Sequence, residues 1–335
     1  NLKTKTDPKG QVIQYDYDAL NRLTFKTYQG CAASICSGNV DYQYDEGSRL
    51  EEVGTVPGLE GTVPIFLINY QYDALNRVKQ ADTTLNAQTF TISYQYDASG
   101  NRTQLTYPHG RITNYTYDSV NRLDQIQNES SQVLYDFNYD SLSRRTSLSR
   151  PNGIATSYTY DTLNRLTQIQ HGSIATISYP LYDKVGNRKQ KTDAQGTHTY
   201  TYDNIYQLTN VSGAQTATYN YDPLGNRTTA SGPGTPSSYT PNNLNQYSSV
   251  DSIPYTYDLN GNLTNDGTFT YAYDFENRLT SVIPAQAGIQ STYQYDPFGR
   301  RITKTVDGQS TTYLYDGDQI LESFPCNLIT GSCTL

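Results

Sequence analysis

The chain has 335 residues, but only 35% of them are hydrophobic, which excludes a uniformly dense core for a domain of this length. The formal net charge is -8 and the basic residues form no cluster, which argues against a nucleic-acid partner. The longest apolar run, residues 63–68, is only as long as a strand, so we expect no membrane span.

Tyrosine supplies much of the apolar area that the chain's low content of other hydrophobic residues leaves missing. The sequence contains 33 Tyr, 8 Phe and no Trp. A tyrosine ring buries a large surface, while its hydroxyl still needs a hydrogen-bond partner or water. The composition therefore predicts thin, partly hydrated layers.

Four cysteines lie in two close pairs, Cys31 with Cys36 and Cys326 with Cys333. Neither spacing resembles a zinc knuckle. They are either four unrelated thiols or two local disulfides that close hairpin loops in an oxidising compartment. We favour the disulfides because each pair lies beside Gly and Ser turn residues, and they predict a secreted or cell-surface protein.

A Tyr-x-Tyr-Asp motif recurs along the whole chain, with a period of about 20 to 22 residues. A degenerate copy, residues 239–247, has Pro241 in place of the aspartate. The aspartates of the fourteen other copies are Asp18, Asp45, Asp73, Asp97, Asp118, Asp140, Asp161, Asp183, Asp203, Asp222, Asp258, Asp274, Asp296 and Asp316.

Each repeat is expected to form one β-hairpin. Residues 156–172 place tyrosines at alternate positions, then an Asp-x-x-Asn turn, then a second alternating segment that ends at a glycine. We therefore predict an all-β fold, a long antiparallel meander of roughly twenty-eight strands. A sheet of more than roughly ten strands curls, splits or closes, so we expect this one to spiral into a shell or a solenoid-like sheet. Ladders of tyrosine rings are expected to hold neighbouring repeats together.

The repeat continues through several insertions, so we predict a single continuous domain over residues 1–335. Loop insertions are expected near residues 28–40, 51–64, 231–238 and 281–290, which are rich in Gly, Pro or small residues. The chain begins at Asn1 without methionine or a signal peptide, and we expect it to be a fragment of a longer protein.

The phrase "YDPLGNR", residues 221–227, contains enough polar chemistry for a small site, but its repetition favours a turn. Asp222 suits the first position of a type I turn, and Gly225 suits a fourth position that needs positive φ. The residues assigned to such structural turns are Asp18, Asp73, Asp118, Asp161, Asp222, Gly225, Asp274, Asp296 and Gly299. Positive φ is predicted at most of Asn21, Asn76, Gly100, Asn121, Asn164, Gly186, Gly225, Gly261, Asn277 and Gly299.

No catalytic, cofactor-binding or metal-binding residue is predicted. The sequence has no phosphate-binding loop, no G-x-S-x-G and no H-E-x-x-H, and His109, His171 and His198 are far apart in the chain. Residues 258–262 and 316–319 lack the further carboxylates of a calcium loop. We therefore expect that this segment is not an enzyme.

The repeats "YDALNRLT", "YDPLGNRT" and "YQYDPFGRRITKTVDGQSTTYLYDGDQILES" resemble the YD repeats of the Rhs and teneurin superfamily, from near Tyr15 to near Phe324. The resemblance implies a spiralling sheet that closes as a hollow shell. Bacterial members are secreted containers for a toxic domain, and teneurins are extracellular adhesion proteins. Shells of the toxin type end in an Asp-Pro-x-Gly-Leu signature with protease activity. Here Arg300 follows the sequence from Asp296 to Gly299, so no catalytic residue is carried over.

Two functions follow as hypotheses. The first is a structural segment of a secreted shell, whose partners are a polypeptide cargo or flanking domains of the same longer chain. The alternative is an extracellular adhesion or fibre protein that binds glycans, or further copies of itself through its unpaired edge strands. The full open reading frame would discriminate between them.

Overall fold

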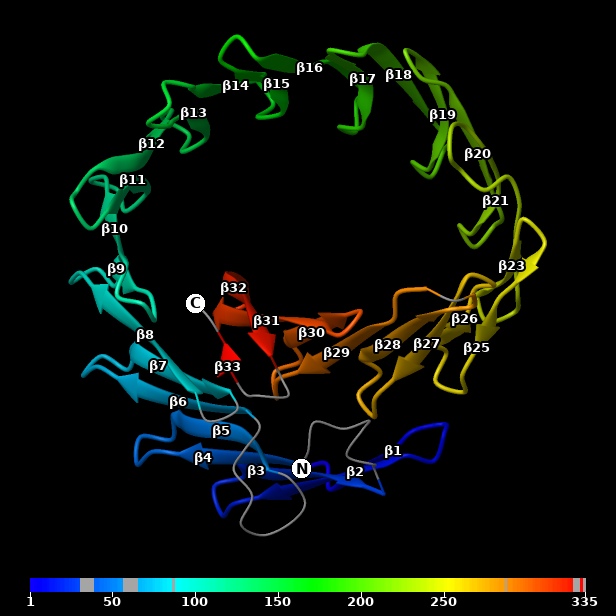
Figure 1. The fold of residues 1–335 in the computed structure, drawn as a ribbon. Coiled ribbons are helices and arrows are strands. Elements are labelled where there is room, and N and C mark those ends of the chain that lie inside the picture. Colours follow the sequence, from blue (N-terminus) through cyan, green and yellow to red (C-terminus); the bar gives the residue numbers. More distant parts are fainter. Residues whose placement is uncertain (31–38, 57–65, 86–87, 287, 328–331, 334–335) are drawn as a thin grey trace. The chain divides into compact units, whose positions relative to one another are not determined.

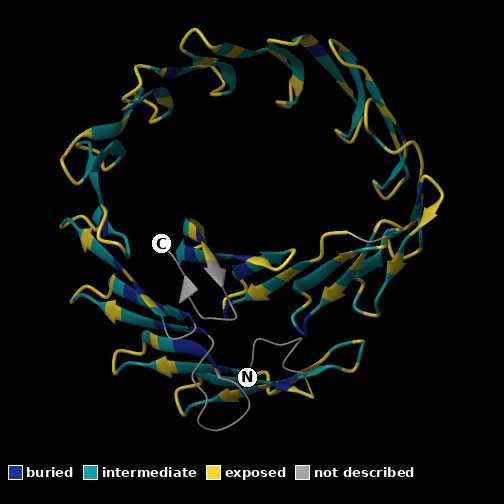
Figure 2. Ribbon diagram, viewed as in Figure 1, coloured by how far each residue is buried: buried dark blue, intermediate teal, exposed yellow. Residues whose placement is uncertain are grey.

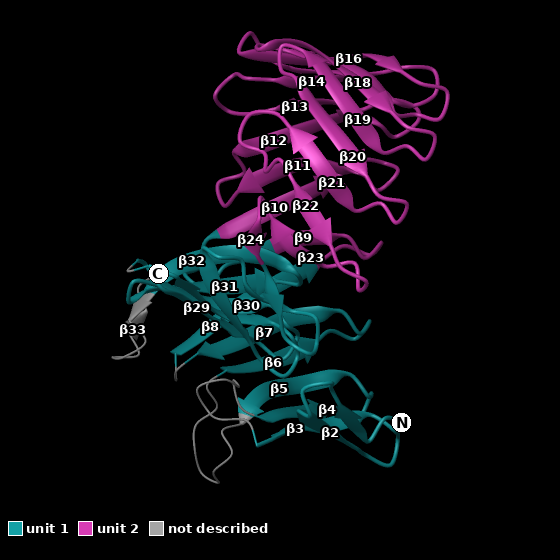
Figure 3. Cartoon of the chain, turned by 90° about the vertical axis from the view of Figure 1, so that its right-hand side faces the viewer, with its two compact units in different colours: residues 1–95, 105–111, 255–335 teal, residues 96–104, 112–254 magenta. Residues whose placement is uncertain are grey.

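Every regular element of the structure is a β-strand. The computed structural model describes residues 1–30, 39–56, 66–85, 88–286, 288–327 and 332–333, and these ranges contain strands β1 to β33 (Figure 1). The predicted all-β meander is confirmed. None of the described residues belongs to a helix that could cross a membrane. The chain divides into unit 1, residues 1–95, 105–111 and 255–335, and unit 2, residues 96–104 and 112–254 (Figure 3).

Unit 1 contains the first and the last hairpins of the chain. Its N-terminal strands are β1 (Thr4–Thr6), β2 (Val12–Tyr17), β3 (Leu23–Gln29), β4 (Asn39–Tyr44), β5 (Leu50–Val56), β6 (Phe66–Tyr72), β7 (Val78–Leu85) and β8 (Gln88–Tyr96), which ends at the boundary with unit 2. Its C-terminal strands are β25 (Thr256–Tyr257), β26 (Leu263–Asn265), β27 (Phe269–Tyr273), β28 (Leu279–Pro284), β29 (Ser291–Tyr295), β30 (Arg301–Val306), β31 (Gln309–Asp316), β32 (Gln319–Asn327) and β33 (Ser332–Cys333).

Unit 2 contains the hairpins between them. Its strands are β10 (Ile112–Tyr117), β11 (Leu123–Asn128), β12 (Val133–Tyr139), β13 (Arg145–Ser149), β14 (Thr156–Tyr160), β15 (Leu166–His171), β16 (Ala175–Tyr182), β17 (Arg188–Asp193), β18 (Gly196–Tyr202), β19 (Leu208–Gly213), β20 (Ala217–Tyr221), β21 (Arg227–Ser231), β22 (Tyr239–Pro241), β23 (Tyr247–Val250) and β24 (Ile253–Pro254). Strand β9 (Arg102–Thr106) has residues in both units.

Each repeat folds into the hairpin that its alternation predicts. In one such repeat β14 pairs antiparallel with β15, and Tyr158 lies opposite Ile169. The register then shifts after Thr159, so that Tyr160 lies opposite Leu166. One extra residue on the return strand makes this β-bulge, which accompanies a type I turn in a hairpin. The shift recurs at the second tyrosine of other repeats because the same turn recurs there.

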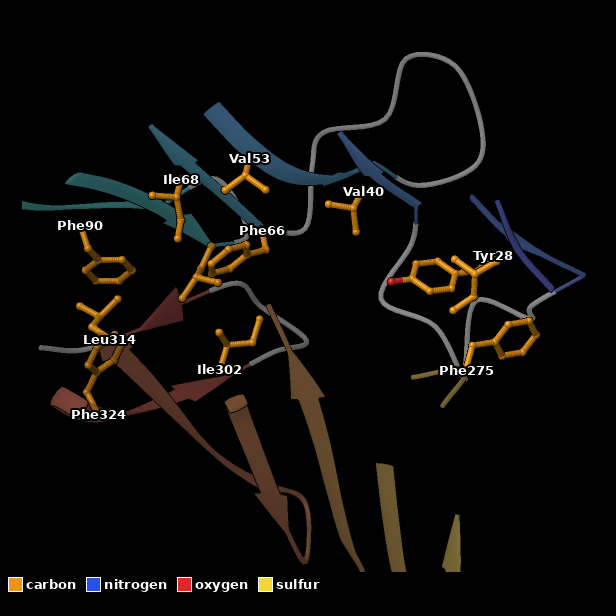
Figure 4. Close-up of a cluster of buried hydrophobic side chains, with 12 residues drawn as sticks. Tyr28, Val40, Val53, Phe66, Ile68, Phe90, Phe275, Ile302, Leu314 and Phe324 are labelled. Atoms are coloured by element: carbon orange, nitrogen blue, oxygen red, sulfur yellow. The ribbon is translucent and has the colours of Figure 1, made fainter. Parts of the chain in front are cut away.

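A densely packed core is present in unit 1. Side chains from β6 and β8 face side chains from β30, β31 and β32, so two layers of sheet bury one cluster between them (Figure 4). Phe66 and Phe90 contribute from the first layer, and Ile302, Leu314 and Phe324 contribute from the second, with none more than 5% exposed. The rings of Phe90 and Phe324 lie 5.0 Å apart. Burying each such side chain contributes about 1.5 to 3 kcal/mol.

Polar contacts also join the N-terminal and C-terminal strands of unit 1. Three of them are Asn260 Nδ2 to Asp7 Oδ2 at 2.5 Å, Lys9 Nζ to Asp258 Oδ2 at 3.2 Å, and Lys26 Nζ to Glu276 Oε1 at 2.7 Å, and we call these three contacts the polar clasp. In addition, the ring of Tyr28 meets the ring of Phe275 edge-on, with 6.2 Å between the ring centres.

Unit 2 is a single layer of strands in which each strand pairs with its neighbour in sequence from β10 to β21 (Figure 3). Most of its strand residues are half-buried, as Figure 2 shows. A single layer has no second sheet to cover it, and tyrosine tolerates such a position because its hydroxyl can stay hydrated. The thin layers predicted from composition are therefore present in unit 2.

The loop insertion predicted near 231–238 is present, since residues 232–238 connect β21 to β22, whereas other predicted insertions are shorter than the composition suggested where the structure describes them. Of the range predicted near 51–64, residues 51–56 belong to β5, where alternate side chains of Val53 and Thr55 are buried, and 57–65 lie outside the described residues. Of the range near 281–290, residues 281–284 belong to β28. In the range near 28–40, residues 31–38 lie outside the described part of the chain. A single domain over residues 1–335 stays a prediction.

Candidate functional site

The repeated turn engages both carboxylate oxygens of its aspartate. At Asp161 one carboxylate oxygen, Oδ1, accepts the backbone N–H groups of Leu163 and Arg165, each at 2.9 Å. The other oxygen, Oδ2, accepts Nε of Arg165 at 2.7 Å. The backbone N–H of Asn164 donates to the Asp161 carbonyl at 3.1 Å, which closes the turn. Such a carboxylate has no free oxygen with which to act on a substrate.

Positive φ at the fourth turn position was predicted and is confirmed. All ten positions have it, from 61° at Asn277 to 96° at Gly186. Glycine and, less readily, asparagine adopt this conformation at the lowest cost, which explains why these two residue types predominate there. Ser48, Ser143 and Tyr206 occupy the same position in three other turns, with φ between 61° and 67°. At Gly225 φ is 87°, and its N–H donates to the Asp222 carbonyl at 3.0 Å.

The arginine of a turn reaches the next repeat. Arg144 Nε donates to its own Asp140 at 2.7 Å, and Nη1 donates to Oδ1 of Asn164 in the following turn at 2.8 Å. The guanidinium also lies over the ring of Tyr160, a favourable cation–π contact. Pairs with this geometry include Arg22 over Tyr44 (4.7 Å), Arg49 over Tyr72 (4.6 Å), Arg122 over Tyr139 (4.7 Å), Arg144 over Tyr160 (4.7 Å), Arg165 over Tyr182 (4.7 Å), Arg278 over Tyr295 (5.1 Å) and Arg300 over Tyr315 (4.8 Å).

The hydroxyl of the same tyrosine points back to the preceding hairpin. Tyr160 donates to the carbonyl of Arg145 at 2.9 Å, and Tyr139 donates to that of Leu123 at 2.8 Å. We expected stacked rings to connect the repeats, but ring pairs such as Tyr70 with Tyr72 lie within one strand. Arginine and hydroxyl contacts connect the repeats as well, because equivalent tyrosines of neighbouring repeats are two strands, or about 10 Å, apart, which is too far for their rings to stack directly. We call this set of contacts the repeat ladder.

The surroundings of the turn carboxylates set their charge. At Asp161 the backbone N–H of Arg165, followed by its guanidinium, lowers the pKa of the carboxyl. At Asp222 the side-chain amide of Asn226 acts first in the same direction. Burial raises the pKa of Asp296, and this exceeds the opposite effect of Arg300. The pKa of the carboxyl is also lowered at Asp18, Asp73 and Asp118.

The turn residues assigned from the sequence occupy the same geometry throughout. Asp274 and Asp296 accept Nε of Arg278 and Arg300, each at 2.6 Å. Gly299 has a φ of 84°. The corresponding arginine also pairs with the carboxylate at Asp18, Asp73 and Asp118.

The three histidines do not come together. Nδ1 of His171 lies 2.9 Å from Oγ1 of Thr156, Nε2 of His198 lies 3.5 Å from Asp193, and Nδ1 of His109 lies 3.3 Å from Glu322. Within the described ranges, no group of three or more His, Cys, Asp or Glu residues could hold a metal ion.

Two of the four cysteines have a defined backbone position. Cys326 in β32 and Cys333 in β33 are directly opposite each other in an antiparallel pair. Their side chains are outside the described part of the structure, as are Cys31 and Cys36 entirely.

The polar clasp could not be predicted from the sequence, because its residues lie about 250 positions apart and form no shared motif.

Two protein families match most of the repeat region. The Teneurin YD-shell family matches residues 181–321, and the RHS Repeat family matches residues 1–28, 72–112, 96–133 and 139–173. The chain belongs to the Rhs and teneurin superfamily of YD-repeat proteins.

Curated relatives of this YD-repeat chain are much longer proteins. The tRNA3(Ser)-specific nuclease WapA of Bacillus spizizenii is 42% identical over 124 residues, which are 35% of this chain and 5% of WapA. The probable deoxyribonuclease RhsB of Dickeya dadantii is 46% identical over 54 residues, 16% of this chain and 4% of RhsB. The YD-repeat chain thus matches only a small part of each relative.

Solved structures share the fold of this YD-repeat chain over almost its whole length. The crystal structure of TcdB2-TccC3-Cdc42 has a TM-score of 0.67 at 18% identity, covering 94% of this chain and 20% of that one. The Photorhabdus luminescens Tc holotoxin pore with the TccC3-D651A mutation has a TM-score of 0.62 at 17% identity, covering 94% and 21%.

Proposed function

We propose that this chain is a wall segment of a secreted YD-repeat shell that encloses a polypeptide carried by the same longer protein. The repeat ladder is the observation that carries the proposal. In unit 2, Arg144 joins its own Asp140 to Asn164 of the next turn, and Arg122 and Arg165 likewise reach the turn that follows their own. A sheet whose neighbouring hairpins are joined in this way suits a barrier better than it suits a binding or catalytic site.

The turn chemistry supports a structural role. The carboxylates Asp118 and Asp161 each accept two backbone N–H groups and one guanidinium. A general acid or base needs a pKa near the working pH, whereas the pKa of each of these carboxyls is lowered from its ordinary value by the hydrogen bonds of the turn. We infer that the nuclease activities named for the relatives come from parts of those proteins that this chain does not match.

The cysteine positions support a location outside the cell. Because Cys326 and Cys333 are directly opposite in β32 and β33, a local disulfide there requires little backbone movement. A stable disulfide implies an oxidising compartment.

Limited proteolysis of the full-length gene product tests the proposal. We expect the segments outside residues 1–335 to include a region that resists protease while the wall is intact. The double substitution Arg144→Ala and Arg165→Ala breaks two neighbouring steps of the repeat ladder and should expose that region. Ile174→Ser, an exposed change on the opposite edge of the same sheet, is the matched control and should leave the protection intact.

The proposal is wrong if every segment outside the wall is digested as fast in the native protein as after denaturation. Full digestion of those segments, combined with binding of the intact protein to cells, would support the adhesion function instead.

A further inference from the structure

A row of exposed aliphatic side chains follows one edge of unit 2. In seven successive turns the third position is Val, Leu or Ile, and these side chains are between 60% and 77% exposed. The seventh turn is that of the degenerate repeat, where Asn242, and not Pro241 as expected from the sequence, takes the place of the aspartate, since its Oδ1 accepts the backbone N–H groups of Leu244 and Gln246. We call this set the turn row: Val120, Leu142, Leu163, Val185, Ile205, Leu224 and Leu244. Nothing in the turn geometry requires an apolar residue there, because the hydrogen bonds involve the aspartate and the backbone.

The turn row has a regular spacing. In a meander every second turn lies on the same edge, so neighbouring members of the row are two strands, or about 10 Å, apart. Side chains fix the turns to one another: Arg122 Nη1 donates to Oγ of Ser143 at 3.2 Å, and Asn226 Nδ2 donates to Oδ1 of Asn245 at 3.2 Å. Figure 2 shows the exposed turns in yellow along the strands of unit 2. The turn row is therefore a pre-ordered surface.

The fully exposed residues on the edge that carries the turn row are almost all uncharged. Three residues are exposed in each of the seven turns, and Lys184 is the only charged residue among these 21. The turn aspartates lie behind these exposed residues: the side chains of Asp118, Asp140 and Asp161 are only 22% to 24% exposed, and each is paired with the arginine of its own turn, which limits repulsion between two copies of this edge. The exposed residues are 119–121, 141–143, 162–164, 184–186, 204–206, 223–225 and 243–245.

Unit 1 shows how a turn of this type is covered. In the turn of residues 274–278, Phe275 is 8% exposed and packs against Tyr28, and Glu276 pairs with Lys26 of β3. The covering surface is strand β3 of another sheet of the chain, and it offers an aromatic ring to Phe275 and a lysine to Glu276. Because the third position of that turn is a glutamate, its partner is a lysine. A turn with an aliphatic third position needs an aliphatic partner.

We propose that the turn row binds the turn row of a second copy of this chain. A second copy presents aliphatic side chains at the same spacing, so every member of the row meets a partner. The 21 exposed residues on each side are within the usual 20 to 30 residues per side of a stable interface, given roughly 800 Å² buried per partner. The contact is made by side chains of turns and differs from pairing of edge strands.

Two-fold symmetry fixes which residues meet. A symmetric dimer uses the same patch on both copies, and the two rows run in opposite directions. Val120 then lies opposite Leu244, Leu142 opposite Leu224 and Leu163 opposite Ile205. Val185, the fourth of the seven, lies on the axis and faces its own counterpart.

Sedimentation velocity of residues 1–335 over a range of concentrations tests this. We expect a monomer–dimer equilibrium in the wild type and at least tenfold weaker association in Val185→Glu, because two carboxylates would then face each other across the axis. Val185→Lys alone should weaken association similarly, and an equal mixture of the two variants should restore it. Ile174→Glu is the control, because Ile174 is 69% exposed on the opposite edge, and it should associate as the wild type does.

Three results would overturn the proposal. They are a wild type that stays monomeric at every concentration, equal effects of Val185→Glu and Ile174→Glu, and a mixture of the Glu and Lys variants that does not associate. Thermal unfolding of each variant checks that the fold is retained. If Val185→Glu does not fold, Val185→Asn replaces it, and undiminished association of that variant also contradicts the proposal.

Discussion

Replacing Gly225 by valine tests whether the repeated phrase is a turn or a site. Gly225 has a φ of 87°, and a Cβ built on it would contact only Nε2 of Gln207, at 3.1 Å. That amide is the end of a flexible side chain and can move, so steric crowding contributes little. The cost comes from the backbone, since a β-branched residue at positive φ is strained by about 1 to 2 kcal/mol.

The chain provides its own control for this substitution. Asn164 occupies the same turn position with a φ of 64°, so Gly225→Asn should cost only a few tenths of a kcal/mol. Urea unfolding followed by tyrosine fluorescence measures both variants. With a denaturant slope of about 3 kcal/mol per molar, the valine variant should lower the midpoint by roughly 0.3 to 0.7 M.

Equal midpoints for the valine and asparagine variants would refute the argument from backbone strain. A valine variant that keeps its stability but loses a measurable binding activity would show that the phrase is a site.

Four further outcomes are expected. Arg144→Ala should lower the midpoint of urea unfolding by more than Arg144→Asn, because an asparagine at this position bonds to its aspartate and to the next turn elsewhere in the chain. Glu276→Gln should destabilise unit 1 by about 1 to 3 kcal/mol at neutral pH, measured by urea unfolding. Burial alone would raise the pKa of Glu276, but its lysine partner lowers that pKa overall. The ion pair therefore stabilises the fold above the ordinary glutamate pKa of about 4.3, and this stabilisation is lost as the pH falls below that value. The Gln variant should lose less stability than the wild type over the same fall in pH. Phe66→Ala should cost about 3 to 5 kcal/mol in thermal unfolding, because the ring is 2% exposed. Mass mapping of unreduced peptides should find Cys326 bonded to Cys333, and free thiols there would contradict the local disulfide.

The repeat hairpins could be predicted from the sequence because their causes are local. An aspartate, a turn and a residue with positive φ lie within five positions, as in residues 161–165, and the hydrogen bonds close over the same five positions. Repetition strengthens the inference, since chance does not place glycine or asparagine at the fourth position so often. Positive φ was therefore predictable at Asn164 and Gly225.

The contacts between repeats were less predictable. The alternation of tyrosines shows which face Tyr158 and Tyr160 share, but it does not show that the Tyr160 hydroxyl bonds to the preceding hairpin. The core of unit 1 was not predictable at all, because Phe90 and Phe324 lie in different parts of the sequence and neither belongs to a motif. The exposure of Leu163 could not be predicted either, since the sequence of a turn does not show whether another layer of the protein covers its apolar side chain.

The polar clasp has a consequence for the order in which the chain acquires structure. Contacts in unit 2 join neighbouring hairpins, so they can form progressively as the polypeptide emerges from a ribosome or a translocation pore. Lys9 and Lys26 instead wait for Asp258 and Glu276, whose sequence separations are 249 and 250 residues. Until then the apolar faces of β2 to β8 stay uncovered. During synthesis or export, therefore, the first hairpins to appear are among the last to become protected, and they are where a holding chaperone is most needed.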